Sequence, residues 1–102
     1  MVHPAGDIKK IIYLFDNNTN ATKEIMATIS VPTPLGDNPH SDHYCYVTIE
    51  TLLSPKKKLI GVDAFHTLLL AVKFIEKFLS ADHKGYEVRN QDGTKYVTPY
   101  PT

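Results

Sequence analysis

A short stretch in the middle of the chain holds the densest group of side chains that could ligate a metal ion. His40, Asp42, His43 and Cys45 lie within six residues, and His, Cys and carboxylate ligands together form tetrahedral zinc sites. Alternation along a strand, however, sends Asp42 to the face opposite His43 and Cys45. No second Cys or His pair completes four ligands, unless His66 reaches across. The stretch is half of a zinc signature, with His40, His43 and Cys45 as candidate ligands, and we expect no cofactor.

The same cysteine could instead serve as a nucleophile. Cys45 with His43 or His66, oriented by Asp63, has the residue types that generate a thiolate. A cysteine in mid-strand between two tyrosines is more typical of a small buried hydrophobic residue. The chain also lacks a Gly-rich phosphate loop, a Ser-centred elbow and a paired-carboxylate motif. We therefore expect a protein that is not an enzyme, with a metal- or Cys-dependent enzyme as an alternative.

Two groups of residues could recognise a partner. Tyr44 and Tyr46 share one face of a predicted strand, and tyrosine offers a large contact area at low entropic cost. His66, Leu70 and Lys73 follow each other at spacings of four and three, so they share one line on a helix. This line is either an ordinary solvated face or a binding ridge with Leu70 as its apolar anchor.

The charge balance limits the classes of partner. The 102 residues carry 11 Lys plus Arg and 11 Asp plus Glu, so the formal net charge is zero. Nucleic-acid and anionic-membrane binders usually need a cationic surplus, and the only basic run is Lys56–Lys58. We therefore expect neither nucleic acid nor a membrane as a partner. The length predicts one domain over residues 1–102, with tails at 1–7 and 99–102.

Cysteine use and the first residues bear on the compartment. Cys45 is the only cysteine, so the chain forms no intramolecular disulfide, whereas small secreted domains usually carry several. The segment from Met1 to Asp7 lacks the charged-then-apolar order of a secretion signal. No run approaches the ~18 apolar residues of a membrane span. These features predict a cytoplasmic protein.

The first half of the chain reads as strands. Ile8–Phe15 and Lys23–Val31 show the β-branched content and two-residue period of a hairpin, with an Asn-rich turn of about five residues between them. Prolines in residues 32–41 predict a stiff connection without ladder pairing. A third strand follows at about Asp42–Leu53, after which Ser54–Lys58 reads as a loop.

The second half predicts one helix and a second hairpin. Asp63 is placed to cap the N-terminus of the helix, and Gly85 to end it. The predicted core-facing stripe comprises Ala64, Phe65, Leu68, Ala71, Val72, Ile75, Phe78 and Leu79. Tyr86–Arg89 and Thr94–Thr98 flank an Asp-Gly turn, which predicts the hairpin.

The order β-β-β-α-β-β gives an α+β domain, an antiparallel sheet with one long helix packed on one face. Such a helix leaves the other face uncovered, and the tyrosine-bearing side, with Met26 beside it, is more apolar than a solvated face. We therefore expect a protein-interaction domain that forms a homodimer through the uncovered face or an open strand edge. An immunity- or adaptor-type partner of another bacterial protein is the alternative.

Two stretches resemble a small bacterial domain family of unknown function. The helix opening Gly61-Val62-Asp63-Ala64-Phe65-His66-Thr67-Leu68-Leu69-Leu70-Ala71-Val72 resembles the family's GVDAxQALxLAL motif, and Asp42-His43-Tyr44-Cys45 resembles its DWxC strand motif. His43 stands where the family usually has Trp, and His66 where it usually has Gln. The resemblance implies the fold and a bacterial cytoplasmic accessory role, and it implies no particular activity.

Overall fold

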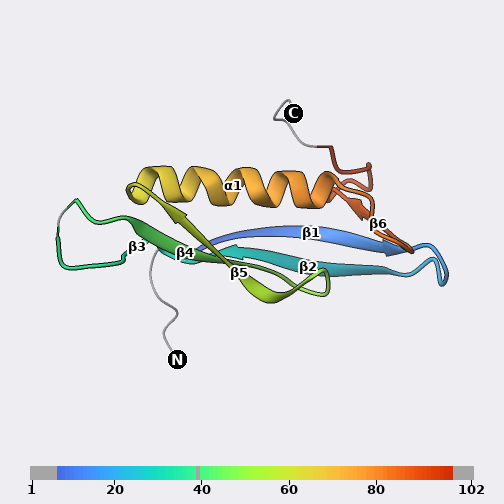
Figure 1. Ribbon diagram of the computed structural model, residues 1–102. Coiled ribbons are helices and arrows are strands. Elements are labelled where there is room, and N and C mark those ends of the chain that lie inside the picture. Colours follow the sequence, from blue (N-terminus) through green and yellow to red (C-terminus); the bar gives the residue numbers. More distant parts are fainter. Residues whose placement is uncertain (1–6, 39, 98–102) are drawn as a thin grey trace.

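The computed structural model describes residues 7–38 and 40–97, which form one sheet of six strands and one helix (Figure 1). The elements are β1 (Ile8–Asp16), β2 (Thr22–Ile29), β3 (Thr33–Pro34), β4 (His43–Ile49), β5 (Leu53–Gly61), α1 (Ala64–Ser80) and β6 (Tyr86–Arg89). Every strand pair in these ranges is antiparallel. The predicted α+β class and the single long helix on one face are confirmed, although five strands precede the helix and one follows it.

The β1–β2 hairpin forms as its local sequence predicts. Ile8 pairs with Ile29 at one end of the ladder and Phe15 with Thr22 at the other. In the connecting loop, the Asn18 amide donates to the Asp16 carboxylate over 2.8 Å, and Asn20 adopts a φ of 58°. Asp and Asn stabilise such turns by local hydrogen bonds and by tolerating the left-handed region.

Strand β4 is the centre of the first half of the sheet. One edge of β4 pairs with β2 through Ile29 and Val47, and further along with β3, where Thr33 lies opposite Tyr44. The prediction that the prolines prevent any pairing in residues 32–41 is therefore wrong at Thr33–Pro34. A proline is tolerated there because β3 is a short strand at the edge of the sheet.

The predicted loop at Ser54–Lys58 is also wrong. The third strand ends at Ile49, the chain reverses at Thr51, whose φ is 70°, and Leu53–Gly61 returns as β5 along the other edge of β4. An edge strand needs hydrogen bonds on one side only, so it accepts a proline and a run of lysines. The sequence predicted a loop at these lysines because no apolar residue alternates with them.

Helix α1 begins where the sequence predicts and ends earlier. The Asp63 carboxylate accepts a hydrogen bond from the His66 amide over 2.7 Å, which confirms the cap. The helix ends at Ser80 and not near Gly85, because the His83 ring donates to the Phe78 carbonyl over 2.9 Å and satisfies a terminal acceptor. Gly85, with a φ of 83°, lies in the turn that leads into β6.

The predicted core-facing stripe of α1 is confirmed at Ala71, Ile75 and Leu79, and the buried side is rotated from it at the start of the helix. Thr67, Ala71, Ile75, Glu76 and Leu79 are buried, whereas Phe65 is 79% exposed and Ala64 is exposed. The rotation follows from the close approach of Thr67 to Gly61, where an added Cβ would lie 2.6 Å from the Thr67 hydroxyl oxygen. The apolar periodicity did not predict the burial of Thr67, because threonine is classed as a polar residue.

The chain after the helix returns to the sheet as an edge strand. β6 pairs with β1 over Tyr13–Asp16. After a turn at Gly93, whose φ is 89°, the chain comes back beside β6 with a bridge between Arg89 and Lys95. The second hairpin is thus shorter than predicted. Thr98, the predicted end of its second strand, and most of the predicted tails at 1–7 and 99–102 lie outside the described residues.

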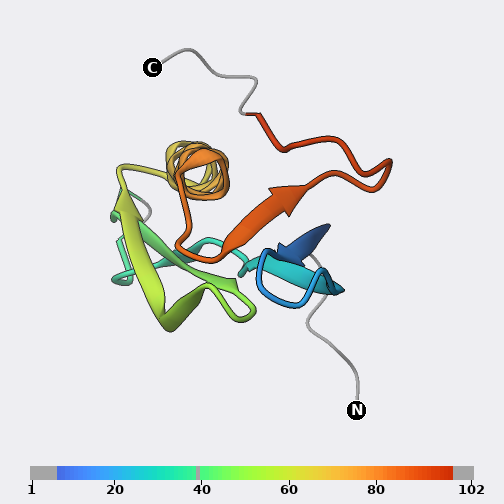
Figure 2. The same ribbon diagram turned by 90° about the vertical axis from the view of Figure 1, so that its right-hand side faces the viewer.

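The two faces of the sheet differ in what covers them. Seen end-on, α1 lies over one face and the opposite face carries no helix (Figure 2). The core between helix and sheet is formed by Ile12, Leu14, Ile25, Ala27, Ile29, Cys45, Val47, Ile49, Ala71, Ile75, Leu79, Val88 and Tyr96. Within the described residues, no helix has the length and apolar character needed to cross a membrane.

Candidate interaction surface

The predicted metal and nucleophile residues do not gather into a site. Cys45 has no exposed surface, and burial raises the pKa of its thiol. The His43 ring donates to the Ser41 carbonyl over 3.1 Å, and His40 is exposed. Within residues 7–38 and 40–97, no three His, Cys, Asp or Glu side chains lie close enough together to hold a metal ion. The arrangement keeps a protonated thiol in the core, where it packs as an apolar side chain.

The helix start is occupied by structural hydrogen bonds. The His66 ring accepts from the Val62 amide over 3.0 Å while its own amide donates to Asp63. The buried Thr67 hydroxyl lies 2.7 Å from the Asp63 carbonyl and 3.2 Å from the His43 carbonyl, and it can donate to either. These contacts position α1 over β4, and they leave His66 half-buried rather than displayed.

Tyr44 and Tyr46 lie on the uncovered face as predicted. Their rings are half-buried and meet edge to face, with centroids 5.7 Å apart. A lysine ammonium lies over each ring, Lys56 at 4.1 Å from the centroid of Tyr46 and Lys58 at 4.8 Å from that of Tyr44. Each such contact is worth about 0.5–1 kcal/mol at an exposed site. The rings are therefore already partly covered.

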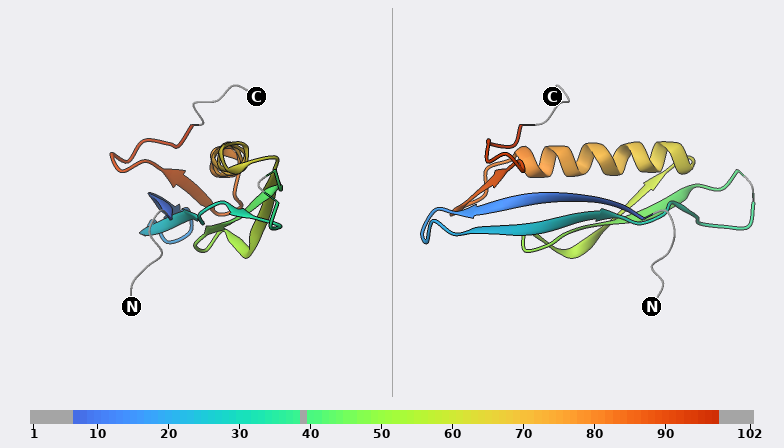
Figure 3. Two further views of the ribbon diagram at one scale, coloured as in Figure 1. Left: turned by 90° about the vertical axis from the view of Figure 1, so that its left-hand side faces the viewer. Right: turned by 180° about the vertical axis from the view of Figure 1, so that it is seen from behind.

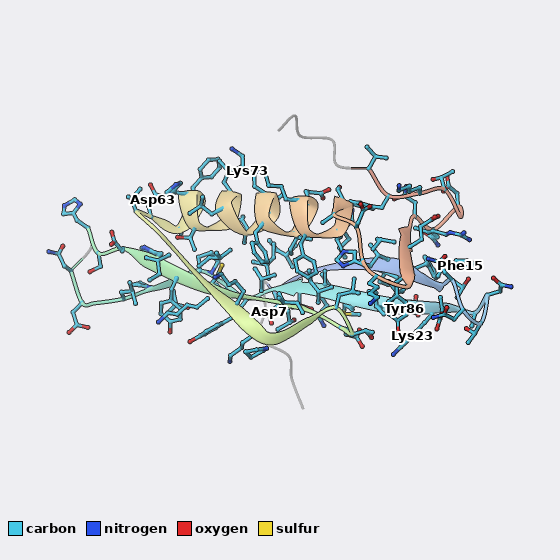
Figure 4. All side chains as sticks on the ribbon, turned by 45° about the vertical axis from the view of Figure 1, so that its right-hand side comes forward. Asp7, Phe15, Lys23, Asp63, Lys73 and Tyr86 are labelled. Atoms are coloured by element: carbon cyan, nitrogen blue, oxygen red, sulfur yellow. The ribbon has the colours of Figure 1, made fainter. Side chains whose placement is uncertain are left out.

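The predicted ridge on the helix lacks a fully exposed apolar anchor. Lys73 lies on the side of α1 that points away from the sheet (Figure 4). Leu70 is half-buried. The ridge is therefore a weaker candidate than the neighbouring flank of the same helix.

That flank is an exposed apolar strip formed by Phe65, Leu68, Leu69 and Val72. Phe65 is 79% exposed and Leu69 is 37% exposed. These four residues surround a shallow hollow of about 160 Å³. Leu68 and Val72 pack at the edge of the core, as the sequence predicts, and among the predicted core residues of this strip only Phe65 is exposed. A sequence signal does exist, since the helix has more apolar positions than one sheet-facing stripe needs.

An apolar groove adjoins this strip, between α1, the first half of β1 and the second half of β2. It has a volume of about 280 Å³, and it meets the strip at Val72, which lines both. Its apolar lining comes from Ile8, Ala27, Ile29, Val72 and Ile75, with Lys10 and Glu76 among its polar residues. The groove is open because α1 lies over β4, β5 and β2, while Tyr96 and the chain before it cover only the far end of β1.

The floor of the groove is also an open strand edge. β2 pairs along one edge of β1, and β6 covers the other edge only over Tyr13–Asp16. No strand in the described part of the chain pairs with the outer edge of Ile8–Ile12, and Ile8 and Ile11 are 43% and 52% exposed. Seen from behind, β1 runs along the sheet below the helix (Figure 3). An open edge with apolar side chains is a site where proteins associate.

Comparisons with protein-family models, with curated proteins and with solved structures give no match. The resemblance to the bacterial domain family therefore stays a prediction, and the argument for a function depends on the surface of the molecule itself.

Proposed function

We propose that the chain is a non-enzymatic protein-interaction domain that forms a homodimer through the apolar strip and the adjoining groove. The observation that carries the proposal is Phe65, a phenylalanine with 79% of its surface exposed beside an apolar groove. Single exposed apolar residues are common, but a continuous apolar surface on a small domain marks an interaction site. We also propose a cytoplasmic location, on the ground of the lone, buried cysteine.

The second copy is the occupant that best fits this surface. A two-fold interface brings the same patch of both subunits together, so a protruding side chain must find a recess on the same patch. Here Phe65 protrudes, and the groove next to it, joined through Val72, is the recess. In such a dimer, each Phe65 enters the groove of the other copy near Ile8, and the open edge of β1 becomes covered.

The two Phe65 side chains contribute a substantial part of the energy that a stable pair needs. Burying a phenylalanine side chain contributes about 1.5–3 kcal/mol, and two-fold symmetry counts it twice. Leu69 and Val72 add to this from both copies. A micromolar dimer requires about 8 kcal/mol in total, after the cost of association. The two Phe65 rings therefore supply a large share, and their loss should be decisive.

The uncovered face is a less favourable interface between two copies. The cations over Tyr44 and Tyr46 would meet the same cations of a second molecule if two of these faces came together. Like charges opposed in an interface oppose association. The groove has one lysine over a ring, Lys10 at 5.4 Å from the centroid of Tyr96, but the Glu76 carboxylate lines the same groove and offsets that charge.

The test is the oligomeric state in solution. We expect sedimentation equilibrium to give a dimer in the micromolar range, and Phe65→Ser to weaken its Kd at least a hundredfold. Val97→Ser is the matched control, because Val97 is 73% exposed and belongs to neither the strip nor the groove. A wild-type chain that remains monomeric at 100 μM would contradict the proposal.

The geometry of the dimer can be tested separately. Phe65→Cys and Ile8→Cys variants are purified and then mixed under mild oxidation, and buried Cys45 serves as the unreactive background. We expect the mixture to give more of the mixed disulfide than random pairing produces. Equal coupling of Phe65→Cys with a Val97→Cys variant would show that the groove does not receive Phe65.

A further inference from the structure

The uncovered face of the sheet has a local charge that the zero net charge hides. Over β4, β5 and the adjoining halves of β2 and β1, the side chains on this face are Lys9, Ile11, Met26, Thr28, Tyr44, Tyr46, Thr48, Lys56, Lys58 and Ile60. These positions include three exposed lysines, and two exposed carboxylates, Asp42 and Glu50, lie just beyond the two ends of β4 on the same face. These side chains point to the uncovered face because successive residues of a strand alternate, and Ile12, Ala27 and Cys45 point to the buried side.

Two further carboxylates lie at the other end of this face. Glu24 is opposite Tyr13, and Glu87 accepts a hydrogen bond from Arg89 over 2.9 Å. The guanidinium of Arg89 lies 3.8 Å from the ring centroid of Phe15. The half of the face that includes β4 and β5 therefore keeps an excess of positive charge, with three lysines against two carboxylates, whereas the half near β6 has two carboxylates against one cation.

We propose that the cationic half, which we call the lysine–tyrosine face (Lys9, Thr28, Tyr44, Tyr46, Lys56 and Lys58), binds single-stranded nucleic acid. The expectation that no polyanion binds was based on the net charge of the whole chain. A bound partner contacts only one face, so the charge of that face decides. The proposal goes beyond the dimer, because Tyr44, Tyr46, Lys56 and Lys58 lie on the side of the sheet opposite α1 and stay open in it, while Lys9 also lines the groove.

The tyrosine rings beside lysine ammonium groups favour single-stranded nucleic acid as the ligand. A single strand alternates flat bases with one negative charge per nucleotide, and proteins bind it with aromatic platforms beside a cationic track. Tyr44 and Tyr46 lie half-buried with Lys58 and Lys56 over them. Contacts of this kind at the surface are weak, so each ammonium can move from its ring to a phosphate and uncover the ring for a base. An acidic peptide would use the lysines but leave the rings without stacking partners.

The test is the binding of a fluorescein-labelled 12-nucleotide poly(U) strand, measured by fluorescence anisotropy from 50 to 300 mM NaCl. Three lysines on three phosphates predict a slope of about −2 for log K against log of the salt concentration. Lys56→Gln with Lys58→Gln should reduce the slope by about 1.4 and weaken binding at least tenfold. Tyr46→Leu should weaken binding about tenfold and leave the slope unchanged.

The matched control removes the same charge elsewhere. Lys57→Gln with Lys84→Gln neutralises two exposed lysines, one on the opposite side of β5 and one in the turn before β6. This variant should bind within about twofold of the wild type. Circular dichroism melts confirm that each variant folds.

Several outcomes would overturn the proposal. One is no binding at 100 μM protein in 50 mM NaCl. Another is an equal loss in the Lys57/Lys84 variant, which would indicate diffuse charge attraction. Equal affinity for a duplex of the same length, or binding to phosphatidylserine vesicles without binding to poly(U), would point to another partner.

Discussion

The hydroxyl of Tyr96 donates a hydrogen bond to the carboxylate of Glu76, and this contact joins the segment after β6 to the C-terminal half of α1. Both side chains are buried, with 5% and 8% of their surfaces exposed. The Lys10 ammonium lies 5.4 Å from the centroid of the Tyr96 ring, on the same side of the sheet. Tyr96 thus closes the core at one end of β1, and the groove lies over the part of β1 that Tyr96 does not cover.

Removing this hydroxyl should destabilise the domain. Tyr96→Phe keeps the ring but leaves a buried carboxylate without that donor, so we expect the free energy of unfolding to fall by about 1–3 kcal/mol. For a chain of this size, each kcal/mol lowers Tm by about 4–8 °C. Urea denaturation measures the change. Tyr86→Phe is the control, because Tyr86 is exposed at the start of β6, and an equal loss there would contradict the assignment.

The packing of α1 on the end of β5 should make Gly61 intolerant of a side chain. A Cβ there would lie 2.6 Å from the Thr67 hydroxyl oxygen and 2.7 Å from the Thr67 amide nitrogen. Because the amide belongs to the helix backbone, it cannot move alone, so Gly61→Ala should cost about 1–3 kcal/mol of stability. Gly36→Ala is the control, since its Cβ would meet only the Ser41 side chain, at 3.1 Å. Equal effects on urea denaturation would refute the close approach.

The helix cap should have a measurable effect of its own. Asp63→Ala removes the acceptor of the His66 amide and should lower stability by about 1 kcal/mol. Asp63→Asn keeps an acceptor oxygen and should retain most of that stability. Asp82→Ala, just beyond the helix, provides the matched loss of a carboxylate. If Asp82→Ala destabilised the domain as much as Asp63→Ala, charge rather than capping would be the cause.

The buried thiol should make stability fall at high pH. Burial raises the pKa of Cys45 above its ordinary value of 9.0, so the unfolded chain loses this proton first. Because the unfolded state then binds fewer protons, the free energy of unfolding decreases as pH rises through about 9. The slope from this group approaches about 1.4 kcal/mol per pH unit.

Comparison with Cys45→Ala isolates this effect from the titration of lysines and tyrosines. Urea unfolding of both proteins between pH 7.5 and 10 should show the extra decline in the wild type alone. The native thiol should also react slowly with a disulfide reagent at pH 8 and quickly in urea. Parallel pH profiles for the two proteins would contradict the raised pKa.

Where the sequence predicts correctly, the signal lies in neighbouring residues. The hairpin of β1 and β2 follows from two-residue alternation around an Asn-rich turn, and the start of α1 follows from Asp63 beside an apolar run. Both depend on hydrogen bonds within a few residues, such as Asn18 to Asp16 and His66 to Asp63. The same holds for Cys45, whose place between tyrosines in a strand indicates burial.

The errors have a different origin. β5 contains Pro55 and three successive lysines, and it becomes a strand because β4 offers it an edge. Gly85 looks like a helix end, but the His83 ring satisfies the Phe78 carbonyl earlier. In each case, the local structure is determined by a hydrogen-bonding group that the pattern of apolar and polar residues does not include.

The sequence by itself therefore determined the class of fold, the one long helix, its starting residue and the buried state of Cys45. Only the tertiary structure decided that Thr67 is buried and Phe65 is exposed, since that depends on Thr67 meeting Gly61 and the His43 carbonyl. Phe65 is exposed as a result, and the position of α1 over β4, β5 and β2 leaves the groove beside β1 open. The positions of Lys56 and Lys58 over the tyrosines were likewise decided only by the tertiary structure, because these contacts join β4 and β5, whose pairing the sequence did not predict.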